Sequence, residues 1–208
     1  MKILFFGDSV TEARWKKYDD YENSALGYGF VMQVAGRLYE KNPVEYEIVN
    51  KGVSGHRIVD LYARIKSDVW NEKPDVLNIL VGVNDVWHEI AHNNGVDIKR
   101  FEKIYRLIIE ETKERLPNTK IILCEPVVLK GTATEYAYER FLEIKNYARV
   151  AERLAKEYGL PFLYLQDKFD KLAEQYNVET FLQDGVHPSV QGASVIAGEW
   201  LKLFEEVR

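Results

Sequence analysis

Residues 2–12 have the sequence Lys-Ile-Leu-Phe-Phe-Gly-Asp-Ser-Val-Thr-Glu, in which a short apolar run stops abruptly at Gly7, Asp8 and Ser9. The run is β-branched and aromatic without a helical period, which predicts a buried strand over residues 2–6. Gly7 permits a sharp turn where a side chain would clash. Ser9 would then lie just past the carboxyl end of a strand, where ligands gather in open α/β sheets. Ser9 is therefore a candidate nucleophile, although Gly-Asp-Ser is also ordinary turn sequence.

Strands and helices alternate along the chain, which is the pattern of a parallel sheet covered on both faces. No repeat, low-complexity stretch or linker divides residues 1–208, so we expect one α/β domain. Right-handed crossovers bring the carboxyl ends of the strands to one edge, where the turns after the first three strands would meet. The predicted strands are 2–6, 46–49, 76–81, 120–124 and 162–165, and the predicted helices are 28–40, 57–70, 97–115, 137–158, 167–176 and 189–206.

The bulk composition is that of an ordinary folded domain, with 208 residues, 46% hydrophobic and 29% charged. The formal net charge of -5 disfavours nucleic acid or an anionic membrane as a partner, because both favour clustered positive charge. Cys124 is the only cysteine, and its apolar neighbours predict a buried thiol. The N-terminus lacks the layout of a signal peptide and no apolar run could span a bilayer, so we expect a cytoplasmic protein.

A base for the serine is available in the segment Asp184-Gly-Val-His187-Pro188, just before the last predicted helix. A serine hydroxyl is a poor nucleophile until a base takes its proton. A carboxylate three residues ahead of a histidine in a turn can reach the second imidazole nitrogen, fix the tautomer and stabilise the imidazolium. The alternative is that Asp184 only caps a turn and His187 only enters a helix.

Acyl transfer also needs hydrogen-bond donors for the oxyanion, and removal of one such donor costs about 10²–10³ in rate. Gly55, in the glycine-rich turn after the second strand, offers a backbone N–H that a ligand can approach closely. Asn84 offers a side-chain N–H after the third strand, and the backbone N–H of Ser9 is a third candidate. The alternatives are a plain turn glycine and an Asx-type cap.

Four blocks together resemble the SGNH subset of the GDSL esterase family: Gly7-Asp8-Ser9, Ser54-Gly55, Gly82-Val83-Asn84-Asp85 and Asp184-Gly-Val-His187. The resemblance implies Ser9 as nucleophile, His187 as general acid and base, and Asp184 as its orienting carboxylate. It also implies an oxyanion hole from Ser9, Gly55 and Asn84, and a flavodoxin-like three-layer α/β/α fold with strand order 2-1-3-4-5. No cofactor or metal is expected to take part.

Within that family, the stretches 49–55 and 81–87 look most like those of bacterial intracellular acetylxylan esterases, which remove acetyl groups from xylo-oligosaccharides. Multimers are frequent among the similar esterases, so we expect a homo-oligomer. Two positions depart from the usual pattern. Glu12 stands where many relatives have Asp, and His56 stands where relatives often have a small polar residue or Asn. Both lie beside the expected site, so they bear on substrate detail.

A competing motif, His88-Glu-Ile-Ala-His92, fits the H-E-x-x-H signature of zinc proteases. Two histidines at i and i+4 of a helix share a face, and Glu89 could polarise a water. The third ligand position of the longer pattern is Ile98, which cannot bind zinc, and residues 93–95 should end any helix directly after His92. We therefore expect this segment to be a loop that lines the substrate pocket.

Aromatic residues follow several of the predicted strands at the edge where Ser9 lies, and aromatic faces suit the apolar C–H surfaces of sugars. The candidate substrate contacts are Asp8, Trp15, His56, Trp87 and His88. The predicted loop 10–26 holds few aliphatic residues, which favours a short acyl group on a polar alcohol over a lipid. We expect an acetylesterase acting on carbohydrates. A lysophospholipase or thioesterase and a non-catalytic sugar-binding protein are the alternatives.

Overall fold

Five parallel strands form the sheet of this computed structural model, which describes residues 1–14 and 24–208. The strand order is β2-β1-β3-β4-β5, so the expected 2-1-3-4-5 topology is confirmed. The register pairs Gly7 at the end of β1 with Gly52 of β2 and with Leu80 of β3, so these three strands end side by side. The strands are β1 Lys2–Gly7, β2 Glu47–Gly52, β3 Val76–Leu80, β4 Lys120–Cys124 and β5 Phe162–Leu163.

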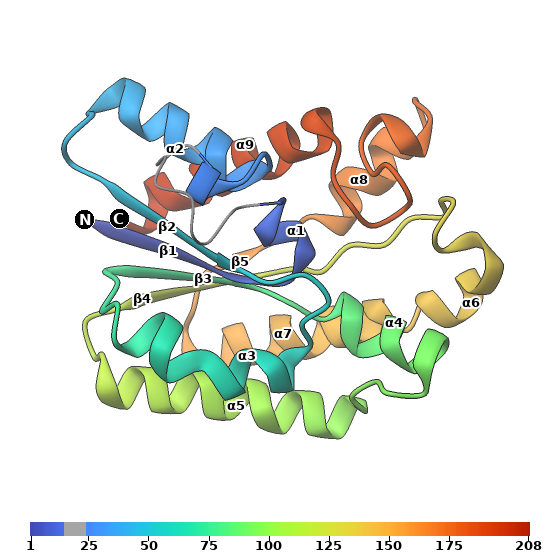
Figure 1. Cartoon of the computed structure of the whole chain (residues 1–208), viewed down its shortest axis with the longest axis horizontal. Coiled ribbons are helices and arrows are strands. Elements are labelled where there is room, and N and C mark those ends of the chain that lie inside the picture. Colours follow the sequence, from blue (N-terminus) through green and yellow to red (C-terminus); the bar gives the residue numbers. More distant parts are fainter. Residues whose placement is uncertain (15–23) are drawn as a thin grey trace.

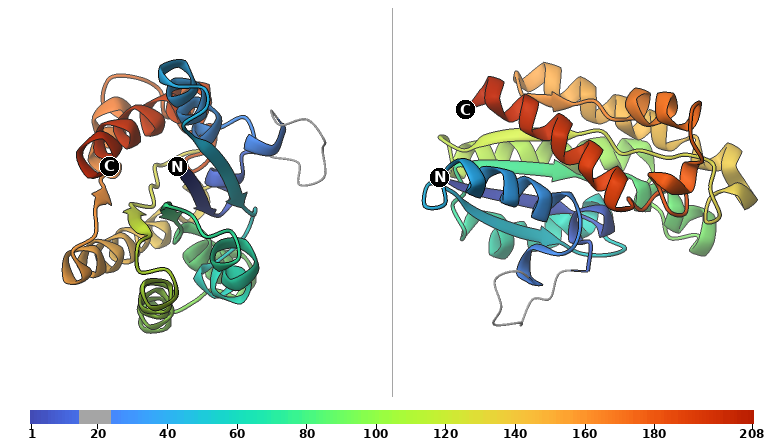
Figure 2. Two further views of the ribbon diagram at one scale, coloured as in Figure 1. Left: turned by 90° about the vertical axis from the view of Figure 1, so that its left-hand side faces the viewer. Right: turned by 90° about the horizontal axis from the view of Figure 1, so that it is seen from above.

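Helices cover both faces of the sheet and make three layers (Figures 1 and 2). One face carries α2 Phe30–Lys41, α8 Gln166–Ala173 and α9 Val190–Val207, and the other carries α3 Ile58–Ile65, α5 Ile98–Arg115 and α7 Ile144–Tyr158.

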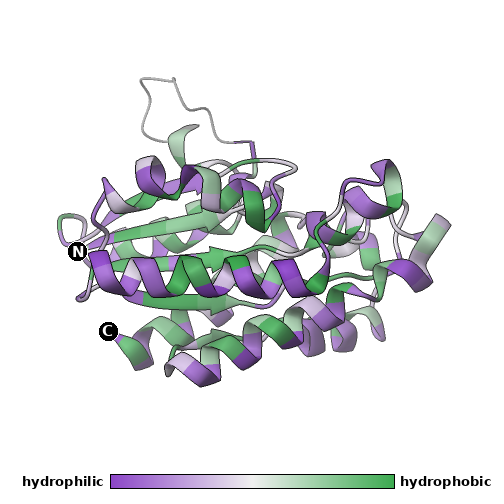
Figure 3. Ribbon diagram, turned by 90° about the horizontal axis from the view of Figure 1, so that it is seen from below, coloured by the Kyte–Doolittle hydropathy of each residue, from purple (hydrophilic) through white to green (hydrophobic). Residues whose placement is uncertain are grey.

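Strand side chains alternate between these two layers because successive residues of a strand point to opposite faces. Leu4 and Phe6 of β1 pack in the core under α3, α5 and α7, whereas Ile3 and Phe5 pack under α2 and α9. The strands are therefore apolar along most of their length, while the covering helices carry polar residues on their outer sides (Figure 3). Burial of both faces explains the near-continuous apolar runs in the sequence.

Short helices gather at the carboxyl edge of the sheet, where the candidate site lies. They are α1 Ser9–Glu12, α4 Val83–His92 and α6 Tyr138–Phe141 (Figure 1). Three 3-10 turns complete the chain that the structure describes: η1 Ser24–Leu26, η3 Glu135–Ala137 and η4 Val178–Thr180. A π-helical turn, η2 Lys66–Trp70, continues α3. Among the described residues, no helix is both long and apolar enough to cross a membrane.

Several predicted elements differ from those observed. The expected helix 137–158 is two helices with a break at residues 142–143, and the expected loop 10–26 begins with α1. The expected strand 162–165 is shorter, because the backbone N–H of Leu165 donates to the carboxylate of Glu125 rather than to a neighbouring strand. The H-E-x-x-H segment was expected to be a loop, but it lies in α4, which begins directly after Gly82 at φ +138°.

Candidate active site

Ser9 is the first residue of α1 and lies two residues beyond the end of β1. The turn is tight because Gly7 lies against the next strand: a Cβ there would be 2.4 Å from the carbonyl oxygen of Leu80. Asp8 caps α1 by accepting a hydrogen bond from the N–H of Val10 at 3.0 Å. The strand end and the cap together fix where the Ser9 hydroxyl lies.

His187 lies beside Ser9, although 178 positions separate them in the sequence. Ser9 Oγ and His187 Nε2 are 2.9 Å apart, and His187 Nδ1 is 2.7 Å from Asp184 Oδ2. The other carboxylate oxygen of Asp184 accepts the backbone N–H groups of Val186 and His187 at 2.9 and 2.8 Å. Asp184 is thereby held by three hydrogen bonds and holds the ring of His187 toward Ser9.

The electrostatics of this pair suit a base. Burial opposes ionisation of Asp184, but the hydrogen bonds from the ring and backbone of His187 outweigh it and lower the pKa of Asp184 to about 2. The hydrogen bond to Asp184 raises the pKa of His187 above its ordinary value, against the opposing effect of burial. The result is an ionised carboxylate that makes the imidazole of His187 more basic.

The turn after β2 carries Gly55, whose φ of +77° lies in the left-handed region that favours glycine. The carbonyl of His56 accepts a hydrogen bond from Asn84 Nδ2 at 3.1 Å, so the turn is joined to the start of α4. A carboxylate oxygen of Glu12 accepts the N–H of Ser54. The structure thus connects the segments that carry the three predicted oxyanion donors.

Two buried carboxylates support these turns, Asp8 and Asp85, which are 2% and 0% exposed. Burial raises the pKa of Asp8 to about 6 and that of Asp85 to about 8. Asp85 accepts the backbone N–H of Ile58 at 3.1 Å, so it anchors the first turn of α3. Sequence reasoning assigned Asp85 no role of its own, and its buried position does not follow from a turn-like sequence such as Gly-Val-Asn-Asp. The burial of Asp8 argues against the predicted substrate contact.

An open crevice of about 580 Å³ surrounds Ser9 and His187. Tyr28 is 70% exposed and Val190 is 71% exposed at its rim, and both present apolar surface to solvent. The other lining residues include Glu12, Arg14, Ser54, Gln183 and Ser189. The crevice is therefore wide, lined by both polar and apolar groups, and edged by one exposed aromatic ring. The predicted contact Trp15 lies outside the described residues.

The remaining predicted contacts lie around α3 and α4. The ring of Trp87 is 6.0 Å from that of His187 and packs edge-on against Phe141 at 5.5 Å, measured between ring centroids. His88 covers Gly55: a Cβ at Gly55 would be 3.8 Å from His88 Nε2. Trp87 therefore lies beside the His187 ring, and His88 beside the Gly55 turn.

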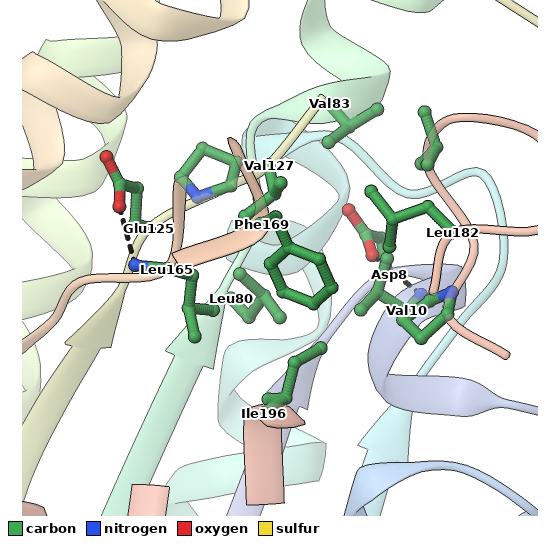
Figure 4. A pocket seen from close by; sticks show the side chains of 13 residues that line it. Asp8, Val10, Leu80, Val83, Glu125, Val127, Leu165, Phe169, Leu182 and Ile196 are labelled. Atoms are coloured by element: carbon green, nitrogen blue, oxygen red, sulfur yellow. Dashed lines mark hydrogen bonds between the residues drawn. The ribbon is translucent and has the colours of Figure 1, made fainter. Parts of the chain in front are cut away.

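A small cavity of about 20 Å³ lies behind the Ser9 turn, and Asp8 is one of the residues that line it (Figure 4). That volume is about the space of one water molecule. Its lining is almost entirely apolar, so it differs from the open crevice in both size and chemistry. The lining side chains include Val10, Leu80, Val83, Val127, Phe169, Leu182 and Ile196.

The H-E-x-x-H segment places the rings of His88 and His92 5.9 Å apart on α4. Asn93, with φ +52°, ends this helix directly after His92, as the sequence predicted. In residues 1–14 and 24–208, no group of three or more His, Cys, Asp or Glu side chains is arranged to hold a metal ion. His88 instead lies against the turn that contains Gly55.

Comparison with known proteins extends this description. The model of the GDSL-like lipase/acylhydrolase family matches residues 5–195. An acetylxylan esterase from Geobacillus stearothermophilus is 33% identical in sequence, and the match covers 100% of this chain and 96% of the esterase. The crystal structure of an acetylxylan esterase from the same organism superimposes with a TM-score of 0.86, covering 97% of this chain and 93% of that chain. The crystal structure of a GDSL-like lipase from Parabacteroides merdae superimposes with a TM-score of 0.89 at 34% sequence identity, covering 98% of this chain and 95% of that chain. A lipoprotein from Bacillus subtilis is 23% identical in sequence, and the match covers 93% of this chain and 85% of the lipoprotein.

Proposed function

Because this chain belongs to the GDSL-like lipase/acylhydrolase family and is a carboxylic ester hydrolase, we propose that Ser9 is its nucleophile, His187 its general acid and base, and Asp184 the carboxylate that orients His187. The hydrogen-bonded series from Ser9 Oγ to His187 Nε2 and from His187 Nδ1 to Asp184 carries the proposal. Family membership does not favour the alternatives of a zinc protease or a non-catalytic sugar-binding protein.

In the first half of the proposed reaction, Ser9 Oγ attacks the ester carbonyl carbon and its proton passes to His187 Nε2. The negative charge that develops on the carbonyl oxygen is stabilised by the backbone N–H groups of Ser9 and Gly55 and by the second side-chain N–H of Asn84. The first N–H of Asn84 already donates to His56, which supports this geometry. The intermediate then collapses, the C–O bond to the alcohol breaks, and the alcohol oxygen takes the proton from His187.

In the second half, His187 takes a proton from a water molecule, whose oxygen attacks the acyl carbon. The bond to Ser9 Oγ breaks, Oγ receives the proton back from His187, and the carboxylic acid leaves. The ionised carboxylate of Asp184 stabilises the imidazolium in both halves without changing its own protonation, since its pKa of about 2 keeps it ionised.

The proposed substrates are acetyl esters of carbohydrates, such as acetylated xylo-oligosaccharides. Likeness to an acetylxylan esterase over the whole chain supports this class. The open crevice also supports it, because its lining mixes charged, polar and apolar side chains, whereas a long acyl chain would need a continuous apolar groove. The apolar cavity behind Ser9 has room for about one water. The exposed ring of Tyr28 at the crevice rim offers a face for a sugar.

The test of the catalytic assignment is Ser9→Ala with 4-nitrophenyl acetate as substrate. We expect kcat to fall at least about 10³-fold while the far-ultraviolet circular dichroism spectrum is retained. Ser194→Ala, an exposed serine on the outer side of α9, is the matched control and should retain wild-type turnover. Turnover by Ser9→Ala close to that of the control would refute the assignment.

The substrate class is tested separately from the catalytic serine. Acetate release from acetylated xylo-oligosaccharides is compared with release from acetylated monosaccharides and with fatty-acid release from lysolipids. We expect the oligosaccharide to have the highest kcat/KM, and 4-nitrophenyl esters longer than butyrate to be poor substrates. A preference for octanoate or for lysolipid would favour the lysophospholipase or thioesterase function instead.

Location and assembly remain proposals that rest on the sequence alone. We propose a cytoplasmic enzyme that forms homo-oligomers. Cell fractionation followed by immunoblotting tests the first, and light scattering coupled to size-exclusion chromatography tests the second. Enrichment in the membrane fraction would instead fit the likeness to a lipoprotein.

A further inference from the structure

A buried guanidinium, that of Arg64 in α3, lies beneath the two turns that the proposed function uses, and its side chain is only 13% exposed. Its Nη2 donates to the carbonyl of Gly7 at 2.9 Å, and its Nη1 donates to the carbonyl of Lys51 at 2.8 Å. Its Nε lies 3.0 Å from Nδ1 of His56. One side chain therefore reaches the end of β1, the end of β2 and the residue that follows Gly55.

The surroundings of Arg64 hold it in this position. Nη1 also donates to Asp68 at 2.7 Å, and Asp68 belongs to the π-helical turn η2 that continues α3. The guanidinium lies over the ring of Phe6, 4.4 Å from its centroid. A planar fork of donors suits several acceptors at fixed angles, which the single ammonium of a lysine cannot reproduce.

The contact with His56 determines where the imidazole carries its proton. A guanidinium has only donors, so Nδ1 of His56 must be the acceptor, and the proton of the neutral ring is then on Nε2. Burial and the positive charge of Arg64 lower the pKa of His56, so the neutral ring is the favoured form. The backbone of His56 is held as well, by Val53 at its N–H and by Asn84 at its carbonyl.

We propose that Arg64 is a positioning residue that sets the Ser9 turn relative to the Gly55–His56 turn and holds His56 as the Nε2–H tautomer. The carbonyl oxygen of Gly7 accepts hydrogen bonds from the Arg64 guanidinium and from the backbone N–H of Val53, so it joins these two turns directly. The inference rests on the proposed function, because the distance between the turns sets the separation of the Ser9 and Gly55 oxyanion donors.

The first test reads the tautomer without any activity measurement. At pH 8, ¹⁵N NMR of the imidazole nitrogens, assigned with His56→Gln, should show Nδ1 of His56 unprotonated and Nε2 protonated. In Arg64→Lys the two tautomers should both be populated. A wild-type His56 that carries its proton on Nδ1 would overturn the inference.

The second test measures kcat and KM for 4-nitrophenyl acetate. Arg64→Lys should lower kcat about tenfold, less than the 10²–10³ that follows loss of a whole donor, with KM changed less than threefold. Arg106→Lys is the matched control, because Arg106 also bonds to several groups, Glu157 and Tyr158 among them, but lies between α5 and α7. The melting temperature of each variant ensures that only folded protein is compared. A kcat of Arg64→Lys within twofold of wild type would overturn the inference.

Chemical rescue separates positioning from packing. Methylguanidinium should raise the kcat of Arg64→Ala severalfold, whereas methylammonium at the same concentration should not; no difference between the two ions would overturn the inference. Ser9→Ala keeps the two proposals distinguishable. An active Ser9→Ala refutes the proposed function and leaves the tautomer test standing, whereas an inactive Ser9→Ala with a fully active Arg64→Lys refutes the Arg64 inference alone.

Discussion

Two turns at the carboxyl edge of the sheet each contain a histidine whose Nδ1 contacts a charged side chain, and the two charges are opposite. In the turn before α9, His187 Nδ1 lies 2.7 Å from the carboxylate of Asp184. In the turn after β2, His56 Nδ1 lies 3.0 Å from the guanidinium of Arg64. The carboxylate contact raises the pKa of His187, whereas burial and the guanidinium lower that of His56. The partner of Nδ1 thus distinguishes His187, the proposed proton acceptor, from His56, the proposed neutral donor.

The aspartates that lie beside these two turns also differ in their pKa values, in opposite directions. Asp184 is half-buried and receives three hydrogen bonds, which lower its pKa to about 2 despite burial. Asp85 is fully buried beside the Gly55 turn and accepts the backbone N–H of Ile58, and burial raises its pKa to about 8. Asp184 is therefore ionised beside His187, whereas the raised pKa of Asp85 favours its neutral form beside the Gly55 turn, where the oxyanion of the proposed reaction would lie.

The largest expected difference in kcat comes from replacing the two histidines separately with alanine. His187→Ala removes the proposed base and should lower kcat about 10⁶-fold. His56→Ala removes only a positioned donor and should lower kcat about tenfold. Steady-state kinetics with 4-nitrophenyl acetate measures both, and folded protein is verified by near-ultraviolet circular dichroism. Equal losses for the two variants would abolish the distinction between the turns.

A smaller effect is expected from Asp184→Asn, which keeps the shape of the side chain and removes its charge. The kcat should fall about 10⁴-fold, because the imidazolium loses its stabilising carboxylate. His187 acts as a base only when neutral, so activity rises with pH through its pKa. Since Asp184 raises that pKa, the acidic limb of kcat/KM should move to lower pH in the variant. An unmoved or upward-shifted limb would contradict the assigned role of Asp184.

The smallest expected effect is a change in the pH dependence of the free energy of unfolding, caused by Asp85→Asn. Between about pH 4 and the folded-state pKa of about 8, the folded wild type retains a proton that the unfolded chain releases. Its free energy of unfolding therefore falls as pH rises through this window, whereas the asparagine variant lacks this loss. The stability difference between the two proteins should change in favour of the variant by about 1 kcal/mol or more between pH 5 and pH 8. Urea titrations at both pH values measure it, and a difference independent of pH would mean that Asp85 is already ionised at pH 5.

Much of the fold could be predicted because the patterns that specify it are local. The strand at residues 120–124 was predicted with its observed bounds, and the buried state of Cys124 followed from its apolar neighbours. Helix α4 was missed because Gly82-Val-Asn-Asp has the composition of a turn, and only the positive φ of Gly82 lets a helix begin there. The end of β5 depends on the side chain of Glu125, which no strand pattern includes.

The sequence predicts which residues form the candidate site, but not which residues hold them in position. Ser9, Asp184 and His187 occur in short recognisable blocks, and the alternating strands and helices bring these blocks to one edge. Arg64 was missed because an isolated arginine in an amphipathic helix usually lies on the solvated face. A signal was present, because Leu61 and Ile65 are both buried apolar residues of α3. Arg64 lies three positions after Leu61 and directly before Ile65, so Arg64 borders the inner face of this helix.

The separation of 178 positions between Ser9 and His187 has a consequence for how the enzyme acquires activity. A contact between groups so distant in the sequence forms late, because loop closure over most of the chain must precede it. The site exists only after α9 has packed against α2 and β1 has paired with strands that follow it in the chain. Recovery of esterase activity after dilution from denaturant therefore reports completed folding of the whole sheet, and it should lag behind the recovery of helical signal.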